Sequence, residues 1–319
     1  MAATYHGVFG RGSRQRSDTR QPTICGCDVH TARLQPFPSN PQNSEHTVKN
    51  EKALVLLSGG QDSVTCLFWA KQEFKEVVAL SIDYGQRHSI ELEAAQRIAK
   101  LAEVRHEIIT VPGILLSASP LTSSSPLELY EDFDSMDAII GERIEKTFVP
   151  MRNALFLVLA ANHAVAWECD YIVIGACQAD NANYPDCRQS FVYLMEYTIR
   201  EGLSGDRRIN IRAPLMFNSK AETVRIAYNL PGCYEALAYS HTAYDGTYPP
   251  TSKDHASVLR AHGFEEAGLP DPLVLRAVFE GRMTVPTTAN YDVILSAPND
   301  ADNFEEYLAG IISAKADNK

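Results

Sequence analysis

The segment Ala53-Leu54-Val55-Leu56-Leu57-Ser58-Gly59-Gly60-Gln61-Asp62-Ser63 decides how this chain of 319 residues folds. Its first five residues form a continuous apolar run, and Val64, Leu67 and Phe68 follow the loop with helical spacing. A short run without polar residues is typical of a strand that is buried on both faces. The segment therefore predicts a buried strand, a tight loop and a helix.

The alternation of strand and helix continues along the chain. We expect further strands at 77–82, 106–111, 171–176 and 209–215, and helices at 90–102, 154–167, 189–201 and 219–229. Strands that alternate with helices predict an α/β fold with a parallel, doubly wound sheet. Residues 117–147, which are rich in Ser, Pro and acidic side chains, interrupt this alternation and predict a long functional or mobile loop.

The pattern divides the chain into three regions. Residues 1–47 are polar, rich in Ser, Arg and Pro, and without apolar periodicity, which predicts a flexible leader. Residues 48–281 form the main domain, with a small helical subregion from about 230 that contains helices near 253–268 and 272–280. Residues 282–319 form a C-terminal extension of unknown role, for which we expect one strand at 291–295 and one amphipathic helix at 303–314.

Composition and charge exclude several classes of protein. The formal net charge of -11 argues against direct binding of nucleic acid, because such binding needs many cationic side chains on phosphates. No apolar run approaches the roughly 18 residues that a membrane-spanning helix needs. The seven cysteines are scattered and odd in number, which is typical of reduced thiols, so we expect a cytoplasmic protein without a membrane anchor.

The loop at residues 58–63 predicts a phosphate site. Two glycines between a buried strand and a helix let backbone N–H groups and the helix N-terminus face an anion. The loop has neither the Gly-Lys-Ser/Thr of a Walker A loop nor the dinucleotide GxGxxG pattern. Since Asp62 by itself repels phosphate, we expect Mg²⁺ between the two. The expected contacts to ATP come from Ser58, Gly59, Gly60, Gln61, Asp62 and Ser63.

Three further segments are candidate parts of the site. The first segment and Gly175 of the third follow strands, and ligands of open parallel sheets bind at the carboxyl ends of the strands. The second segment precedes an apolar helix. The first is Asp83-Tyr84-Gly85-Gln86-Arg87-His88, the second includes Phe148, Pro150, Arg152 and Asn153, and the third includes Gly175, Asp180, Tyr184, Pro185 and Asp186. Lys220, at the start of a helix, could reach phosphate oxygens. Turn formation by the first segment, a helix-end role for Arg152 and a solvated Lys220 stay open as alternatives, and Cys187 is a weak candidate nucleophile.

Six segments in this order, SGGQDS, SIDYGQRH, FVPMRN, GACQAD, YPDCR and PLMFNSKAET, resemble the 7-cyano-7-deazaguanine synthase (QueC) family of pyrophosphatase-loop ATP enzymes, over roughly residues 52–276. The resemblance implies a Rossmann-like fold of the adenine nucleotide alpha hydrolase type, with strand order 3-2-1-4-5. It implies a carbon–nitrogen ligase that converts 7-carboxy-7-deazaguanine, ammonia and ATP into the 7-cyano base of the queuosine pathway through adenylation of the carboxylate.

The resemblance also distributes roles among the candidate residues. Asp62, Ser63, Arg152 and Lys220 are the expected catalytic residues. The nucleotide is expected to contact residues 58–63, Asp83, Tyr84, Gly85, Gln86, Arg87 and Gly175. The deazapurine is expected to contact His88, Phe148, Pro150, Arg152, Asn153, Asp180, Tyr184, Pro185 and Asp186.

One departure from the family pattern concerns zinc. The family carries four cysteines that bind structural zinc, and our alignment puts Ala243, Thr251, Asp254 and Ser257 at their places. With only His255 beside them, these residues cannot form a closed tetrahedral site, so we expect no structural zinc.

The missing cysteines leave the nitrogen acceptor open. Some defence-associated relatives join the activated deazaguanine to an amine of a partner protein, so the resemblance allows either ammonia or a protein acceptor in an antiviral system. A third hypothesis is a catalytically silent nucleotide or nucleobase sensor. The sequence does not determine the oligomeric state, for which a homodimer is the default expectation.

Overall fold

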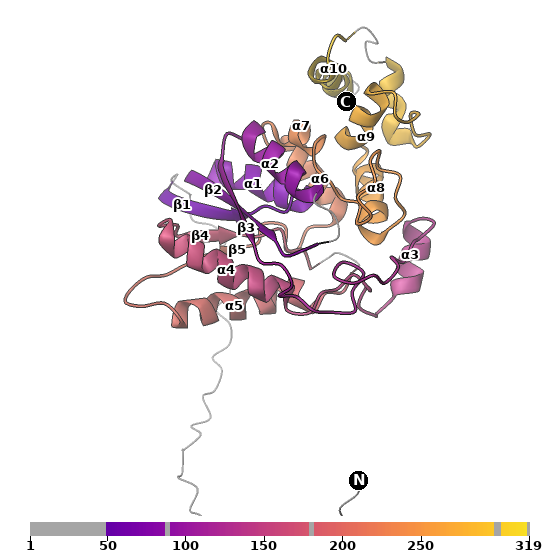
Figure 1. Ribbon diagram of the computed structural model, residues 1–319. Helices are drawn as coiled ribbons and strands as arrows, with labels where there is room; N and C mark the ends of the chain where they lie inside the picture. The colour runs from indigo at the N-terminus through magenta and orange to yellow at the C-terminus, as the bar shows by residue number, and fades with distance from the viewer. Residues whose placement is uncertain (1–48, 87–89, 179–181, 297–300, 318–319) are drawn as a thin grey trace, which may run out of the picture. The chain divides into compact units, whose positions relative to one another are not determined.

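A parallel five-stranded sheet forms the centre of the fold (Figure 1). The computed structural model describes residues 49–86, 90–178, 182–296 and 301–317, so the expected leader at 1–47 and the candidate residues Arg87, His88 and Asp180 lie outside the described part. The strands are β1 (Lys49–Leu56), β2 (Phe74–Asp83), β3 (Arg105–Thr110), β4 (Tyr171–Val173) and β5 (Asn210–Arg212). All neighbouring strands pair in parallel, and their order β3-β2-β1-β4-β5 confirms the predicted topology.

Helices cover both faces of the sheet (Figure 1). One face packs against α1 (Gln61–Glu73), α2 (Ile90–Leu101), α6 (Lys220–Asn229) and α7 (Cys233–Leu237). The other face packs against α4 (Arg152–Ala166) and α5 (Gln189–Glu201). These bounds agree with the predicted helices to within a few residues, so the doubly wound architecture is confirmed.

The first strand shows why its sequence is apolar without interruption. Side chains alternate between the faces of a strand, so Val55 and Leu57 enter the core beneath α1 and α7, while Leu54 enters the core beneath α4. Leu54, Val55 and Leu57 are each 0–1% exposed. Because helices cover both faces, neither side of β1 can carry a polar residue at low energetic cost.

Two predictions of local structure are wrong. Residues 117–147 are not one uninterrupted loop, since they contain α3 (Phe133–Ile140), which begins with a capping box between Asp132 and Ser135. The expected strand at 291–295 is part of the 3₁₀ helix η2 (Ala289–Ser296). This segment lies against α10 and α8 and belongs to no strand of the described sheet, and its Tyr291 amide donates to the Thr288 carbonyl at 3.0 Å in a local turn.

The C-terminal part of the described chain is helical and packs on itself. It contains α8 (His255–Ala267), α9 (Pro272–Phe279) and α10 (Phe304–Asp317), and the short 3₁₀ helix η1 (Pro185–Cys187) lies earlier in the chain. The Phe279 ring of α9 lies 5.9 Å from the ring of Phe304 and 5.3 Å from that of Tyr307. Among the described residues, no helix is both long and apolar enough to cross a membrane.

Candidate active site

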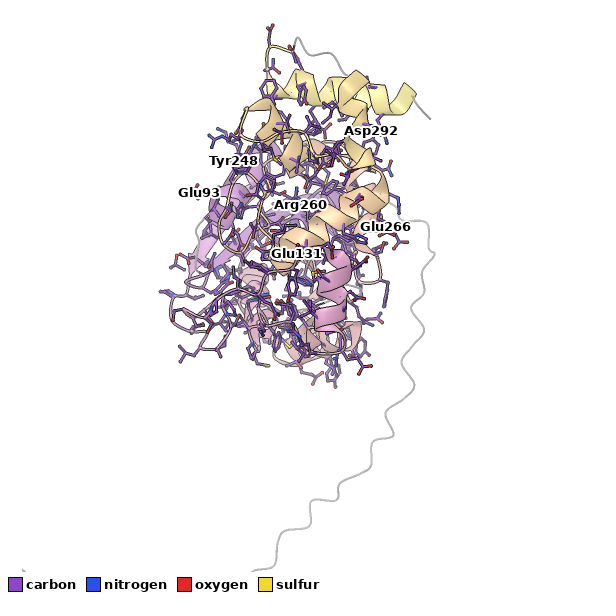
Figure 2. All side chains as sticks on the ribbon, turned by 90° about the vertical axis from the view of Figure 1, so that its right-hand side faces the viewer. Glu93, Glu131, Tyr248, Arg260, Glu266 and Asp292 are labelled. Carbon is purple, nitrogen blue, oxygen red and sulfur yellow. The ribbon has the colours of Figure 1, made fainter. Side chains whose placement is uncertain are left out.

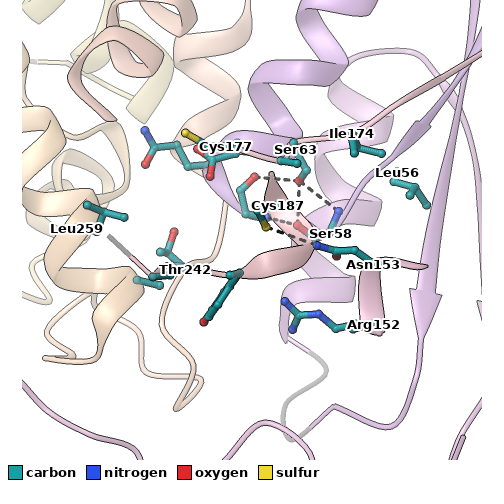
Figure 3. A pocket seen from close by; sticks show the side chains of 18 of the residues that line it. Leu56, Ser58, Ser63, Arg152, Asn153, Ile174, Cys177, Cys187, Thr242 and Leu259 are labelled. Atoms are coloured by element: carbon teal, nitrogen blue, oxygen red, sulfur yellow. Dashed lines mark hydrogen bonds between the residues drawn. The ribbon is translucent and has the colours of Figure 1, made fainter. Parts of the chain in front are cut away.

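A cavity of about 550 Å³ opens at the carboxyl ends of β1 and β4 (Figure 3). Its walls come from the loop at 58–63, the starts of α4 and α6, the segment that includes η1, and the segment that leads into α8. The predicted residues that line it are Ser58, Gly60, Gln61, Asp62, Ser63, Tyr84, Arg152, Asn153, Gly175, Tyr184 and Lys220. Segments that are distant in sequence thus meet at one site at the carboxyl ends of the strands, as the strand-end rule predicts.

Hydrogen bonds of Ser58 and Ser63 fix the conformation of the phosphate loop. The hydroxyls of Ser58 and Ser63 lie 3.0 Å apart, Ser63 donates to the Gly60 carbonyl at 3.0 Å, and the Ser58 amide donates to the Ser63 hydroxyl at 3.1 Å. Gly60 is the N-cap of α1 and provides no side-chain cap. The first N–H groups of α1 therefore face the cavity end of the helix without a side-chain acceptor, an arrangement that suits an anion.

Packing requires glycine at two positions, at Gly59 within the loop and at Gly175, which lies beside the loop. Gly59 has a φ of +90°, and a Cβ atom there would overlap the backbone carbonyl oxygen of Glu91 and lie 2.9 Å from the Ala95 amide. A Cβ atom on Gly175 would lie 3.0 Å from the Ser63 amide. Gly59 thus allows α2 to abut the loop, and Gly175 allows β4 to approach the start of α1.

Asp62 and Lys220 form an ion pair beside the loop. The Lys220 Nζ lies 2.9 Å and 3.1 Å from the two Asp62 carboxylate oxygens, and the Lys220 side chain is only 9% exposed. The alternative of a solvated surface lysine is therefore excluded. The pair brings a cation to the mouth of the phosphate loop and offsets the repulsion that Asp62 alone would exert on phosphate.

Arg152 lies in the cavity below the phosphate loop (Figure 3). Burial alone would lower the pKa of its guanidinium, but the hydroxyls of Tyr84, Tyr184 and Tyr244 surround it and together raise that pKa. Tyr84 hydrogen-bonds the guanidinium directly. No ion pair of Arg152 occurs within the described residues. A partly buried cation surrounded by neutral hydroxyls is suited to bind an anionic ligand.

The Tyr184 side chain is fixed from two sides. Its hydroxyl hydrogen-bonds Thr147, lies 3.3 Å from a carboxylate oxygen of the buried Glu145, and its ring lies 5.5 Å from that of Phe148. Burial raises the pKa of Tyr184, so its hydroxyl stays neutral. Phe148 therefore supports the site from behind Tyr184, while Phe148, Pro150 and Pro185 do not line the cavity.

Asp186 is placed differently from the prediction. Its carboxylate accepts a hydrogen bond from the Asn153 amide at 3.3 Å, and the Asn153 side chain donates to the Asp186 carbonyl at 3.2 Å. Asp186 is 6% exposed and does not line the cavity, whereas Asn153 and Cys187 do. The acid caps the N-terminus of α4 and so positions Arg152 and Asn153.

The segment after β2 contributes only one wall residue from its described part. Tyr84 lines the cavity, and its ring lies 5.4 Å from that of Phe156. Asp83 accepts a hydrogen bond from the Gly85 amide at 3.0 Å, and Gln86 accepts one from the Tyr84 amide at 3.1 Å. Asp83, Gly85 and Gln86 thus shape the turn that presents Tyr84. This arrangement is the turn formation that we named as the alternative for this segment.

Several wall residues were not predicted from the sequence. They are Glu91 on α2, His241, Thr242 and Tyr244 in the segment before α8, and His255 and Arg260 on α8. Figure 2 shows Arg260 on α8. Its guanidinium pairs with Asp271 at 2.6 Å and donates to the Thr242 hydroxyl at 2.8 Å, which ties the segment to two helices. These residues carry no local motif; the packing of α2 brings Glu91 to the site, and the packing of α8 and of the segment before it brings the others.

A hydrogen-bond knot surrounds Asp254, one of the residues that our alignment puts at the places of the zinc cysteines expected from the resemblance. The Asp254 carboxylate is fully buried and accepts hydrogen bonds from the Tyr244 amide at 2.8 Å, the Ser257 amide at 2.9 Å and the Ser252 hydroxyl at 2.9 Å. The described residues contain no group of three or more His, Cys, Asp or Glu side chains that could hold a metal. The donor set around Asp254 does not fit zinc, because protein N–H and O–H groups already engage its carboxylate.

Two polar atoms of wall residues lack partners. The Nε2 atoms of Gln61 and His255 are buried and make no hydrogen bond within the described residues. Burial lowers the pKa of His255, so its ring is neutral near pH 7. Buried polar groups without a partner are uncommon in folded proteins and are often found at ligand sites.

Comparisons with known proteins converge on one family. The family model described as "Queuosine biosynthesis protein QueC" matches residues 52–268, a range that contains every described wall residue. A 7-cyano-7-deazaguanine synthase from Chromobacterium violaceum is 44% identical over 238 residues, which cover 73% of this chain and 97% of that protein. One from Gloeobacter violaceus is 46% identical over 227 residues, which cover 70% of this chain and 95% of that protein.

Similarity to solved structures is weaker. An NH3-dependent NAD synthetase from Campylobacter jejuni has a TM-score of 0.34 at 15% identity and covers 86% of this chain and 89% of its own. A 4-thiouridine synthetase, solved with RNA and bound ATP, has a TM-score of 0.36 at 16% identity and covers 67% of this chain and 53% of its own.

Proposed function

This chain belongs to the QueC family of queuosine biosynthesis proteins, and we propose that it adenylates 7-carboxy-7-deazaguanine with ATP and then forms 7-cyano-7-deazaguanine with ammonia. The observation that carries the proposal is that one cavity joins an uncapped helix N-terminus, with a lysine at its mouth, to a partly buried arginine that forms no ion pair within the described residues. The first suits pyrophosphate, and the second suits a carboxylate.

The phosphate end of the cavity is assigned to ATP. The loop at 58–63 would hold the leaving pyrophosphate, with Lys220 beside it. Where Mg²⁺ accompanies ATP, Asp62 is the protein carboxylate nearest to the phosphates, and the metal would neutralise their charge. The role of the chain's own residues is to fix the phosphates in one position through backbone N–H groups.

The opposite end is assigned to the deazapurine acid. Arg152 would bind the substrate carboxylate and turn one oxygen toward the α-phosphate. Tyr184, held by Thr147 and Glu145, provides a rigid aromatic face for the heterocycle. Since Asp186 does not line the cavity, we assign it to support of α4 and not to base recognition.

The chemistry explains why these two ends must meet. A carboxylate is a poor electrophile, so its oxygen first attacks the α-phosphate, pyrophosphate departs, and an acyl-adenylate forms. Ammonia then displaces AMP to give the amide, and a second activation of the amide oxygen followed by loss of AMP gives the nitrile. The protein needs no nucleophile of its own for these steps, and it acts by positioning and charge stabilisation.

A second candidate for the acceptor of the activated acid is an amine of a partner protein. The altered zinc region, where Asp254 replaces a metal ligand, is the observation that favours this candidate. The silent-sensor hypothesis requires binding without turnover.

One experiment separates these functions. The full chain is incubated with 7-carboxy-7-deazaguanine, Mg-ATP and ammonia, and pyrophosphate and product masses are followed. We expect substrate-dependent pyrophosphate release and a nitrile product. Ligand-induced thermal stabilisation without pyrophosphate would refute catalysis, and an acyl-adenylate that reacts only with an added protein would assign the second candidate.

Variants of the ion pair test the site itself. We expect Lys220→Met to lower kcat about 100-fold, because a buried cation that stabilises transferring phosphates contributes on that order. Lys146→Met removes an exposed lysine that pairs with Glu128 outside the cavity, so its activity should match that of the unmodified protein. Equal activity of both variants would remove Lys220 from the proposal.

A further inference from the structure

Glu91 is an acidic side chain inside the cavity to which the proposed function has so far assigned no role. It lies in the first turn of α2 and lines the cavity together with Arg152. Its backbone carbonyl oxygen occupies the space that a Cβ atom on Gly59 would need. Glu91 therefore adjoins the phosphate loop through its backbone and shares the cavity with Arg152. In the proposed function, the activated carbon lies between that loop and Arg152.

The Glu91 carboxylate has an unusual surrounding. It forms no hydrogen bond or ion pair within the described residues, although it is only partly exposed. The charged and titratable groups that face it are Arg152 from α4, Asp254 from the N-cap of α8, and the hydroxyls of Tyr84 and Tyr244. An acid that is enclosed and yet unpartnered is available for proton transfer to a bound ligand.

Burial sets the protonation state of this acid. Desolvation raises the pKa of Glu91 to about 7, Arg152 acts in the opposite direction, and the negative charge of Asp254 adds to the increase. A general base works best when its pKa lies close to the operating pH.

The geometry points to Glu91 as the catalytic residue that takes the proton from the attacking nitrogen. The inference rests on the proposed function, since it needs an acyl-adenylate in the cavity. It applies whether the nitrogen belongs to ammonia or to a protein amine, because both must lose a proton.

The step balances as follows. The nitrogen lone pair forms the C–N bond, and the carbonyl π electrons move to oxygen. Glu91 accepts one N–H proton, the oxygen lone pair re-forms the carbonyl, and the C–O bond to phosphate breaks and releases AMP. Glu91 then gives its proton to solvent, so one acyl-adenylate and one ammonia yield one amide, one AMP and one proton.

The test separates the two half-reactions of the full-length protein. Pyrophosphate release without ammonia reports adenylation, and amide formation after addition of ammonia reports the nitrogen step. For Glu91→Gln we expect adenylation within about threefold of the unmodified protein and amide formation about 100-fold slower at pH 8. Dividing the amide rate of the unmodified protein by that of Glu91→Gln at each pH cancels the ionisation of ammonia, which affects both equally. We expect this ratio to fall to a few-fold below pH 6, where Glu91 is protonated in the unmodified protein.

Two further variants keep the result interpretable. Glu93→Gln changes an exposed acid on the same helix (Figure 2) and should leave both half-reactions unchanged. Glu91→Asp retains a carboxylate and should restore part of the amide rate together with its pH dependence.

Several outcomes would overturn the inference. They are an amide rate of Glu91→Gln within threefold of the unmodified protein at pH 8, a ratio that does not change with pH, equal loss of both half-reactions, or an effect confined to KM for the deazapurine. Absence of pyrophosphate release by the unmodified protein would instead refute the proposed function, and the inference with it.

Discussion

Replacement of Asp254 by alanine should destabilise the protein strongly. The carboxylate is fully buried and accepts hydrogen bonds from two backbone amides, of Tyr244 and Ser257, and from the Ser252 hydroxyl. Hydrogen bonds to a charged group contribute about 1.5–3 kcal/mol each, and each buried donor left without an acceptor costs about 1–3 kcal/mol. These contributions overlap, so we expect a loss of about 4 kcal/mol in the free energy of unfolding.

A matched variant shows whether burial is the cause. Asp132 is also the N-cap of a helix, α3, but it is exposed, so Asp132→Ala should destabilise the protein much less than Asp254→Ala. Both variants are compared with the unmodified protein by urea unfolding at pH 7, with zinc content measured on the same samples. If Asp254→Ala loses no more stability than Asp132→Ala, or if the unmodified protein carries one zinc per chain, the reasoning about the knot is refuted.

Two further predictions concern the phosphate loop and α2. Gly59→Ala should abolish measurable turnover, because its Cβ would overlap the Glu91 carbonyl. The control Gly113→Ala, at a φ of +73° with open space around it, should cost only about 1 kcal/mol of stability and no activity. Equal turnover of the two variants would contradict the packing argument. Glu91→Gln should be more stable than the unmodified protein at pH 8, by up to about 3 kcal/mol. The pKa of Glu91 is raised from 4.5 to about 7 on folding, so the unmodified protein loses stability as the pH rises through that interval, and thermal melts should show the advantage of the variant vanish below pH 4.5.

The parts of the fold that the sequence predicts are those that depend on local patterns. The continuous apolar run of β1 requires cover on both faces, so it predicted the layered architecture correctly. The strand expected at 291–295 was wrong because β propensity says nothing about whether a pairing partner is within reach. The pattern of apolar residues at 291–295 alone could not distinguish a strand from a 3₁₀ helix.

The part of the site that lies in sequence motifs was predicted, and the part outside them was missed. Ser58, Arg152 and Lys220 stand in motifs, whereas Glu91 has the appearance of an ordinary acid in the first turn of a helix, where the helix dipole favours one. Asp186 was expected to contact the substrate because the sequence cannot show that its carboxylate faces the backbone of α4. Roles that depend on the direction of a side chain need the tertiary structure.

The Asp254 knot has a consequence for the conditions under which the protein can work. A wall built from a carboxylate, two amides and a hydroxyl needs neither a transition metal from the cell nor thiols kept in the reduced state. Metal starvation and peroxide, which dismantle thiolate–zinc clusters, therefore leave this wall of the cavity intact.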